Sequence, residues 1–183
     1  MNTRLLGTVF IIATLVVIAD GLRSGGELDR LSALAYSIWG IGGVCAIVGL
    51  IKLNALGSNT VARALGLLPL IGFAAFTVGD GLRLAGFITA EDSLFFVLAG
   101  LAWISMLAGM LLVGILTIAA KTWRGWRRFV PLLTIVLAFA GMGLGSFVGE
   151  DIGAAIGYSA FLLLGYVIAT AEQPAALPQS AVA

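Results

Sequence analysis

Apolar residues fill six long stretches of this chain, and short polar segments separate them. Each stretch has about 18 or more residues with almost no charge, which is the length a helix needs to cross the hydrocarbon core of a bilayer. The apolar runs are continuous rather than alternating, so they predict helices and not the strands of a membrane barrel. The expected spans are Leu5–Leu22, Leu31–Leu53, Val61–Ile88, Leu94–Ala120, Phe129–Val148 and Ile152–Thr170.

The two ends of the chain need separate treatment. The short basic start at Arg4 and the apolar run after it could form a signal peptide. That run is long, however, and Ala19-Asp20-Gly21 is a poor cleavage site, so we expect a retained first span. Residues 172–183 contain two prolines and no periodic pattern. We expect them to form a disordered cytoplasmic tail.

Pro69 lies inside the third expected span, where a proline removes a backbone hydrogen bond and clashes with the preceding turn. It predicts either a kink or a short interfacial turn before the span proper. The fourth span, with about 27 residues, is longer than the hydrocarbon core and should tilt or project from the membrane.

Basic residues lie mainly on one side of the expected membrane. One side carries Arg4, Lys52, Arg63, Lys121, Arg124, Arg127 and Arg128, and the other carries Arg23, Arg30 and Arg83. Because cytoplasmic loops are enriched in Lys and Arg, this asymmetry places both termini in the cytoplasm. It predicts a multi-pass protein of the plasma membrane, of the prokaryotic inner-membrane type.

A tetrapeptide recurs along the chain: Asp20–Arg23 has the same sequence as Asp80–Arg83, with an offset of 60 residues. A fainter third copy begins near Gly141. The repeat predicts an all-α membrane protein made of three helical hairpins in one orientation. The hairpins would cover residues 5–53, 61–120 and 129–171 within one domain, residues 1–171.

The repeated Asp and Arg residues favour one of two structures. Asp20 with Arg23, and Asp80 with Arg83, are three residues apart and so share a helix face. Local pairing would make a salt-bridged collar at the outer ends of the first and third spans. Crossed pairing, Asp20 with Arg83 and Asp80 with Arg23, would line an outward-facing polar pocket. A proton or ion relay is the third alternative, although no ionisable residue lies near the bilayer centre.

Glycines at steps of four favour close helix packing, either inside the chain or against another membrane subunit or a second copy. They are Gly141, Gly145, Gly149, Gly153 and Gly157. Tryptophans and cations between the fourth and fifth spans are typical of an interfacial anchor, with bound anionic lipid as the alternative. That anchor comprises Lys121, Trp123, Arg124, Trp126, Arg127 and Arg128.

Two further groups of polar residues lie at the ends of the spans or within them. Glu91-Asp92 and Glu150-Asp151 begin the fourth and sixth spans, where carboxylates cap helices. An outer cation site is the alternative for these carboxylates. Five polar-tipped aromatics are expected to pack in the core, with a cofactor cradle as the alternative. They are Tyr36, Trp39, Trp103, Tyr158 and Tyr166.

The composition agrees with a membrane protein and argues against several classes of function. The chain is 61% hydrophobic and 10% charged, with mean hydropathy +1.13, whereas soluble domains are about 45–50% apolar and about 25% charged. A net charge of +1 argues against nucleic-acid binding. Without histidine, and with only Cys45 as a thiol, the sequence lacks the usual zinc and haem ligands and any Ser/His or Cys/His pair, so we expect no metal and no cofactor.

The sequence therefore predicts a non-enzymatic polytopic protein whose partners are the lipid bilayer and other membrane subunits, or a second copy. The favoured hypothesis is an accessory or scaffold subunit that packs in a membrane assembly through glycine-rich helix faces. The alternative is a solute-handling protein, either a channel or a substrate-binding transporter component. Its polar pocket would then face outward at the Asp/Arg pairs.

Overall fold

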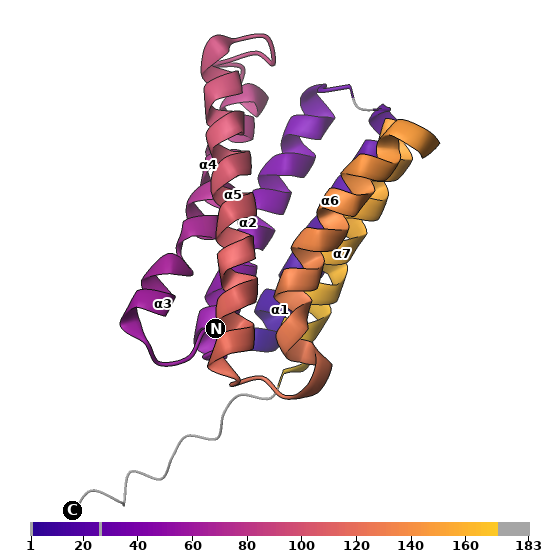
Figure 1. Ribbon diagram of the computed structural model, residues 1–183. Helices are drawn as coiled ribbons and strands as arrows, with labels where there is room; N and C mark the ends of the chain where they lie inside the picture. The colour runs from indigo at the N-terminus through magenta and orange to yellow at the C-terminus, as the bar shows by residue number, and fades with distance from the viewer. Residues whose placement is uncertain (1, 26, 172–183) are drawn as a thin grey trace, which may run out of the picture.

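The computed structural model describes residues 2–25 and 27–171, except for the side chains of Met142 and Glu150 (Figure 1). These ranges are helical with connecting loops, and no strand occurs in them. The tail expected over residues 172–183 lies outside the described part. The helices are α1 (Thr3–Ser24), α2 (Arg30–Lys52), α3 (Thr60–Leu65), α4 (Leu68–Leu84), α5 (Ser93–Ala120), α6 (Val130–Val148) and α7 (Glu150–Thr170), with a short 3₁₀ helix, η1 (Gly125–Phe129), before α6.

Six stretches of the described chain are long and apolar enough to cross a membrane. They are α1, α2, the pair α3 and α4 taken together, α5, η1 with α6, and α7. The expectation of six helical stretches of membrane length is confirmed. The chain thus has the form of a multi-pass membrane protein, while its orientation and its membrane stay predictions.

Polar side chains and a left-handed glycine define the first two helix ends. The Asn2 side chain accepts a hydrogen bond from the Arg4 backbone N–H at 3.0 Å, and the Asp29 side chain accepts one from the Ser32 N–H at 2.8 Å. Both residues thereby satisfy backbone donors that a helix start leaves free. Gly25 ends α1 with a φ of 60°, a conformation that favours glycine.

The third expected span, Val61–Ile88, is found as two helices, α3 and α4, that together make one candidate span over Thr60–Leu84. The helix breaks between Leu65 and Leu68, and Pro69 lies in the first turn of α4. Proline is tolerated in a first turn because the N–H it lacks has no intrahelical acceptor there. Of the two alternatives at Pro69, the structure has a short helix before the span proper. That helix, α3, projects sideways from the bundle (Figure 1).

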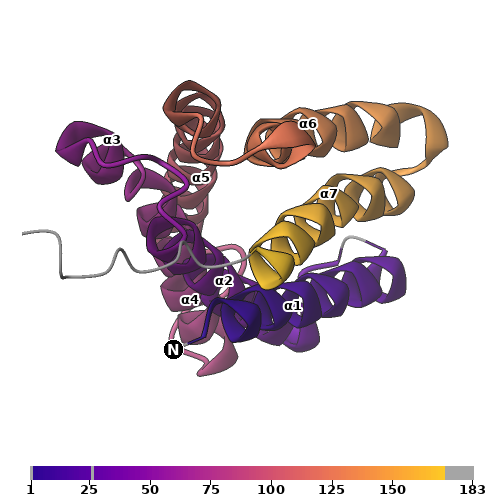
Figure 2. The same ribbon diagram turned by 90° about the horizontal axis from the view of Figure 1, so that it is seen from below.

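The helices form an incomplete ring around the core. Helix α1 packs against α2 and α7, α2 packs against α4, α4 against α5, and α6 against α7 (Figure 2). The contact between α5 and α6 is much smaller. In Figure 1 the α4–α5 pair and the α6–α7 pair separate toward the upper end of the molecule. The bundle is therefore least closed between α5 and α6.

Small residues allow the first and last helices to approach closely. A Cβ on Gly7 of α1 would collide with the backbone of Ala169 in α7, and one on Gly165 would lie 3.2 Å from the Gly7 carbonyl oxygen. Such small-residue contacts bring helix backbones together in membranes. The bundle therefore joins the two ends of the chain.

An aromatic cluster centred on Trp39 connects three helices. Trp39 of α2 is fully buried, and its ring meets Phe73, Phe76, Tyr158 and Phe161 edge-to-face, with centroids 5.2–5.6 Å apart. Phe73 and Phe76 belong to α4, and Tyr158 and Phe161 belong to α7. Edge-to-face aromatic pairs add stabilisation beyond the area that they bury. This cluster holds the two diverging arms together below their separation.

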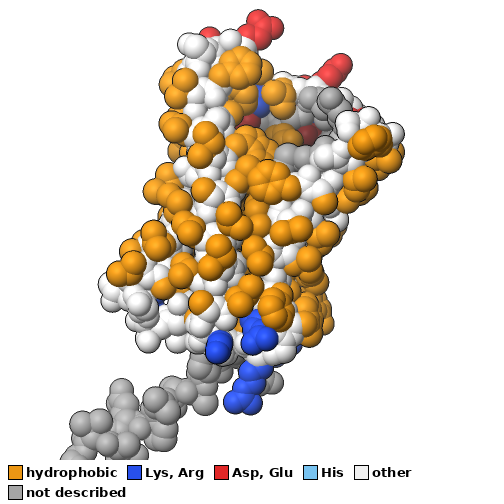
Figure 3. Space-filling view, viewed as in Figure 1, with side chains coloured by type: hydrophobic (Ala, Val, Ile, Leu, Met, Phe, Trp, Pro, Cys, Tyr) orange, Lys and Arg blue, Asp and Glu red, His pale blue; other side chains and the backbone are white. Residues whose placement is uncertain are grey.

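Charged side chains divide between the two ends of the bundle (Figure 3). We call the end with the α1–α2, α4–α5 and α6–α7 connections the acidic end, and the opposite end the basic end. The acidic end has Glu27, Asp29, Glu91, Asp92 and Asp151. The basic end has Lys121, Arg124, Arg127 and Arg128.

This charge separation makes the orientation testable. In a Cys45→Ala background, an impermeant maleimide added outside intact cells should label a cysteine at Glu27. It should not label a cysteine at Gln179. The reason is that the seven-to-three excess of basic residues favours a cytoplasmic basic end. The reverse pattern would invert the predicted orientation, and labelling at both positions would exclude an even number of spans.

Candidate functional site

Both Asp/Arg pairs form within their own helices at the acidic end. An Arg23 Nη lies 2.6 Å from an Asp20 carboxylate oxygen, and an Arg83 Nη lies 2.6 Å from an Asp80 carboxylate oxygen. No crossed ion pair joins α1 to α4 among the described residues. The geometry is that of the local alternative rather than the crossed one.

The two pairs differ greatly in their surroundings. The side chains of Asp80 and Arg83 are 6% and 5% exposed, whereas that of Arg23 is 43% exposed. Arg83 also donates to the Leu28 carbonyl oxygen at 2.7 Å, and its guanidinium lies 4.7 Å from the centre of the Phe95 ring. Arg83 therefore ties α4 to the α1–α2 connection and to the start of α5.

Arg23 links the end of α1 to the start of α2. It donates to Asp20 and, at 2.9 Å, to Asp29, the residue that caps α2. The hydrogen bond from Arg23, together with that from the Ser32 N–H, holds the pKa of the Asp29 carboxyl well below its usual range. The carboxylate therefore stays ionised at neutral pH and keeps both helix ends together.

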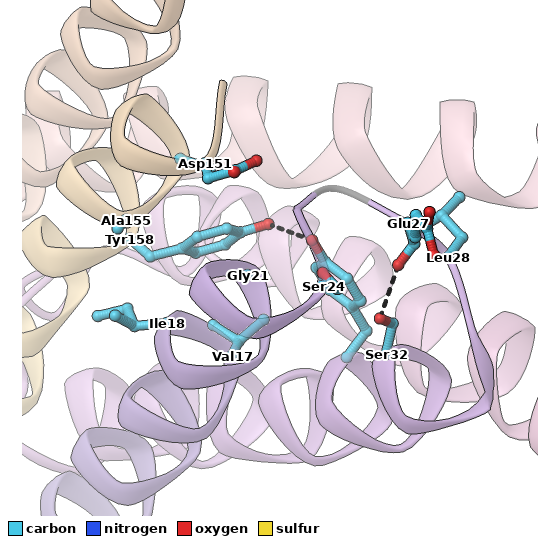
Figure 4. A pocket seen from close by; sticks show the side chains of 12 residues that line it. Val17, Ile18, Gly21, Ser24, Glu27, Leu28, Ser32, Asp151, Ala155 and Tyr158 are labelled. Carbon is cyan, nitrogen blue, oxygen red and sulfur yellow. Dashed lines mark hydrogen bonds between the residues drawn. The ribbon is translucent and has the colours of Figure 1, made fainter. Parts of the chain in front are cut away.

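A small cavity of about 160 Å³ lies between α1, α2 and α7 at the acidic end (Figure 4). Its wall is apolar toward the core, with Val17 and Ile18 of α1. Leu28, Ala154 and Ala155 add further apolar lining, and the polar side chains are Ser24, Glu27, Ser32, Tyr36, Asp151 and Tyr158. The cavity therefore has an apolar floor and an acidic, hydroxyl-rich rim.

A second cavity, of about 240 Å³, adjoins the first. Trp103 of α5, Ala138 of α6 and Phe161 of α7 line it on the side where α5 and α6 diverge. Tyr36, Ala154 and Tyr158 line both cavities. The Tyr158 hydroxyl donates to the Tyr36 hydroxyl over 3.4 Å, and these two rings separate the cavities. We call these two adjoining cavities, one with an acidic rim and one with an aromatic lining, the recess.

The residues expected to line a pocket lie beside this recess, not in it. Asp20, Arg23 and Asp80 line neither cavity, and Arg83 faces a separate surface depression next to the α4–α5 connection. From the sequence, Tyr36, Trp103 and Tyr158 are expected to pack in the core, and binding is the alternative. Asp151 is expected to cap a helix, and a cation site is the alternative. Nothing in the sequence pattern singled out Glu27.

The glycines at steps of four pack α6 against α7 within the chain. A Cβ on Gly141 would collide with the backbone of Gly157, and one on Gly153 would collide with the backbone of Gly145. Gly149 differs, because it lies in the turn between the helices with a φ of 103° and has open space around it. Four of the five glycines are therefore occupied by contacts inside the hairpin.

The segment expected to be an interfacial anchor divides in two. Trp126 is 53% exposed, as an interfacial residue should be, but Trp123 is only 9% exposed and joins the buried apolar core. Arg128 stacks on the Phe129 ring at 4.6 Å, and Arg127 donates to the Thr170 carbonyl oxygen at 3.4 Å. Lys121 and Arg124 remain exposed at the basic end.

The fold and site together define a class: an all-helical chain with six helices that can span a membrane, and a recess that opens at one end. A comparison with protein-family models, curated proteins and solved structures gives no match. Conclusions on function therefore depend on the geometry of this chain.

Proposed function

We propose that this chain is a solute-handling membrane protein that holds a small amphipathic molecule in the recess at its acidic end. The observation that carries this proposal is the pair of cavities that share Tyr36 and Tyr158. Binding sites for small molecules are concave and mostly apolar, with a few polar groups, and in helical proteins they lie between the helices. Cavities of about 160 and 240 Å³ suit a ligand of modest size.

The Asp/Arg pairs support the recess from outside. The Asp80–Arg83 pair holds the α1–α2 connection through the Leu28 carbonyl, and the Asp20–Arg23–Asp29 network holds the ends of α1 and α2. Both helices and the connection contribute walls to the first cavity. Ion pairs at this position hold the walls of a site in place before the ligand binds, without contacting the ligand themselves. In this proposal their role is positional, and the chain performs no chemistry on the solute.

The accessory-subunit hypothesis is weaker. It depended on glycine faces that are free to receive a partner helix. Gly141, Gly145, Gly153 and Gly157 instead make contacts between α6 and α7 of the same chain. The glycines spaced at steps of four are thus used inside the chain, so we favour the solute-handling function.

Access to the recess can be tested with a neutral thiol reagent. Ala154 lines both cavities, so Ala154→Cys in a Cys45→Ala background should react with 2-hydroxyethyl methanethiosulfonate in lipid nanodiscs. The matched control is Ile104→Cys on the exposed apolar side of α5, where lipid keeps the thiol un-ionised. We expect the rate at position 154 to exceed the control at least about tenfold, because only water-accessible thiols ionise. Equal rates would overturn the proposed function.

A further inference from the structure

We propose that the ligand of this recess is a small lipophilic organic cation, an ammonium group that carries an aromatic or similarly bulky apolar substituent. This inference rests on the proposed function and names the chemical class that the site selects. Three features carry it: unpaired carboxylates on the first cavity, aromatic faces on the second, and the engagement of each nearby arginine elsewhere.

Two carboxylates face the first cavity from different elements. Glu27 belongs to the α1–α2 connection, and Asp151 belongs to the first turn of α7, on the other side of the cavity (Figure 4). Neither takes part in an ion pair among the described residues. Glu27 is exposed and Asp151 is half-buried, so both charges lie where a solute enters. Carboxylates that line an apolar recess focus negative potential into it and attract cations.

The positive charges of the acidic end are already engaged. Arg23 binds Asp20 and Asp29, Arg83 binds Asp80 and the Leu28 carbonyl, and Arg30 donates to the Leu84 carbonyl at 3.2 Å. None of these arginines lines either cavity. An anionic ligand would therefore meet two carboxylates and no compensating cation, which excludes it on charge.

The second cavity offers π-faces to the apolar part of a ligand or to the cation itself. Tyr36, Trp103, Tyr158 and Phe161 line it, and Tyr158 is more than nine-tenths buried. A cation over an aromatic ring gains electrostatic attraction, and this gain is larger where water is excluded. The hydroxyl oxygens of the two tyrosines lie at the junction with the acidic cavity, where they can accept hydrogen bonds from an ammonium group.

A metal ion suits this recess less well than an organic cation. Hard metal cations take six or more oxygen ligands, and among the described residues no three Asp, Glu, His or Cys side chains are grouped to hold one. An ammonium with an apolar substituent needs fewer oxygens, and it uses the aromatic wall that a bare metal would leave unused.

Protection of Ala154→Cys measures binding by charge class. The probes are benzyltrimethylammonium, its neutral isostere neopentylbenzene, and the anion phenylmethanesulfonate. For each probe, the measurement is how far it slows the reaction of the cysteine with the neutral thiol reagent in nanodiscs. A cysteine at Phe87, which is exposed at the same end and outside both cavities, is the control that no probe should protect. We expect the cation to halve the reaction rate of Ala154→Cys at a concentration about tenfold lower than the isostere needs. The reason is that two nearby carboxylates and the aromatic faces attract a cation but not a neutral molecule.

Carboxylate variants test the origin of this preference. Glu27→Gln and Asp151→Asn should each weaken protection by the cation about threefold, and together they should remove its advantage over the isostere. Glu91→Gln takes the same charge from the same end but lines neither cavity, so it should leave the preference intact. The single variants suffice if the double variant does not fold.

The outcomes separate this inference from the proposed function. Equal protection by the cation and its isostere, or better protection by the anion, would overturn the cation inference and leave a solute site. Loss of the preference in Glu91→Gln as large as in Asp151→Asn would also overturn it, because the effect would then be long-range. A reactive Ala154→Cys that none of the three probes protects would count against both.

Discussion

Asp80→Asn is expected to lower the free energy of unfolding by about 3–5 kcal/mol, because it leaves the buried Arg83 guanidinium without its carboxylate. Arg83 is 5% exposed and lies between the α1–α2 connection and the Phe95 ring. Water therefore has little access to compensate the charge. The measurement is unfolding by an anionic detergent in mixed micelles, monitored by circular dichroism.

The equivalent pair on α1 provides the control. Asp20→Asn should cost about 1 kcal/mol or less, because the Arg23 guanidinium that it leaves behind is 43% exposed and keeps Asp29 as a partner. The double variant Asp80→Asn with Arg83→Leu should recover part of the loss, since it removes the stranded charge. A cost below about 1 kcal/mol for Asp80→Asn alone would contradict the prediction and would mean that carbonyl acceptors suffice for Arg83.

Gly153→Ala is expected to destabilise the α6–α7 hairpin by about 1–3 kcal/mol or more, because the added methyl group would meet backbone rather than a flexible side chain. Its Cβ would collide with the backbone of Gly145. Backbone cannot move aside without separating the two helices. The same detergent titration measures the change, and hydrogen exchange should locate it in α6 and α7.

Gly143 of the facing helix α6 is the control for this prediction. Gly143 has no neighbouring atom within 4 Å of the position of an added Cβ. Gly143→Ala should therefore be neutral or stabilising by about 0.5–1 kcal/mol, as expected for alanine in a helix. If both substitutions had the same effect, the close α6–α7 contact would not be the source of stability.

Local patterns in the sequence were enough to predict where the long helices lie and which charged residues stand at their ends. Apolar run length located the six stretches, and the three-residue spacing of Asp80 and Arg83 made a local pair one of two alternatives. Pro69 marked the break before α4 but did not decide between a kink and a short helix. In the structure the Arg63 side chain donates to Asn54 at 2.8 Å and so connects α3 to the preceding loop, a contact that local sequence patterns do not contain.

Local sequence patterns could not predict the recess, because residues far apart in the sequence form it. Tyr36 and Tyr158 are 122 residues apart and meet only because α7 packs beside α1 and α2. Periodicity also says little in spans that are apolar on every face, so it did not reveal that Trp123 turns inward. Likewise, steps of four predicted a glycine contact but not whether its partner would be a helix of the same chain.

The pairing of α1 with α7 has a consequence for biogenesis. Helix α1 emerges from the ribosome well before α7, the helix that covers its Gly7 face. Until α7 is made, that face of α1 lacks its partner helix, and the walls of the recess at Tyr158 and Asp151 do not exist. This part of the bundle therefore assembles only once the α6–α7 hairpin has been made and can dock on α1 and α2. The proposed solute site forms at that step and not earlier.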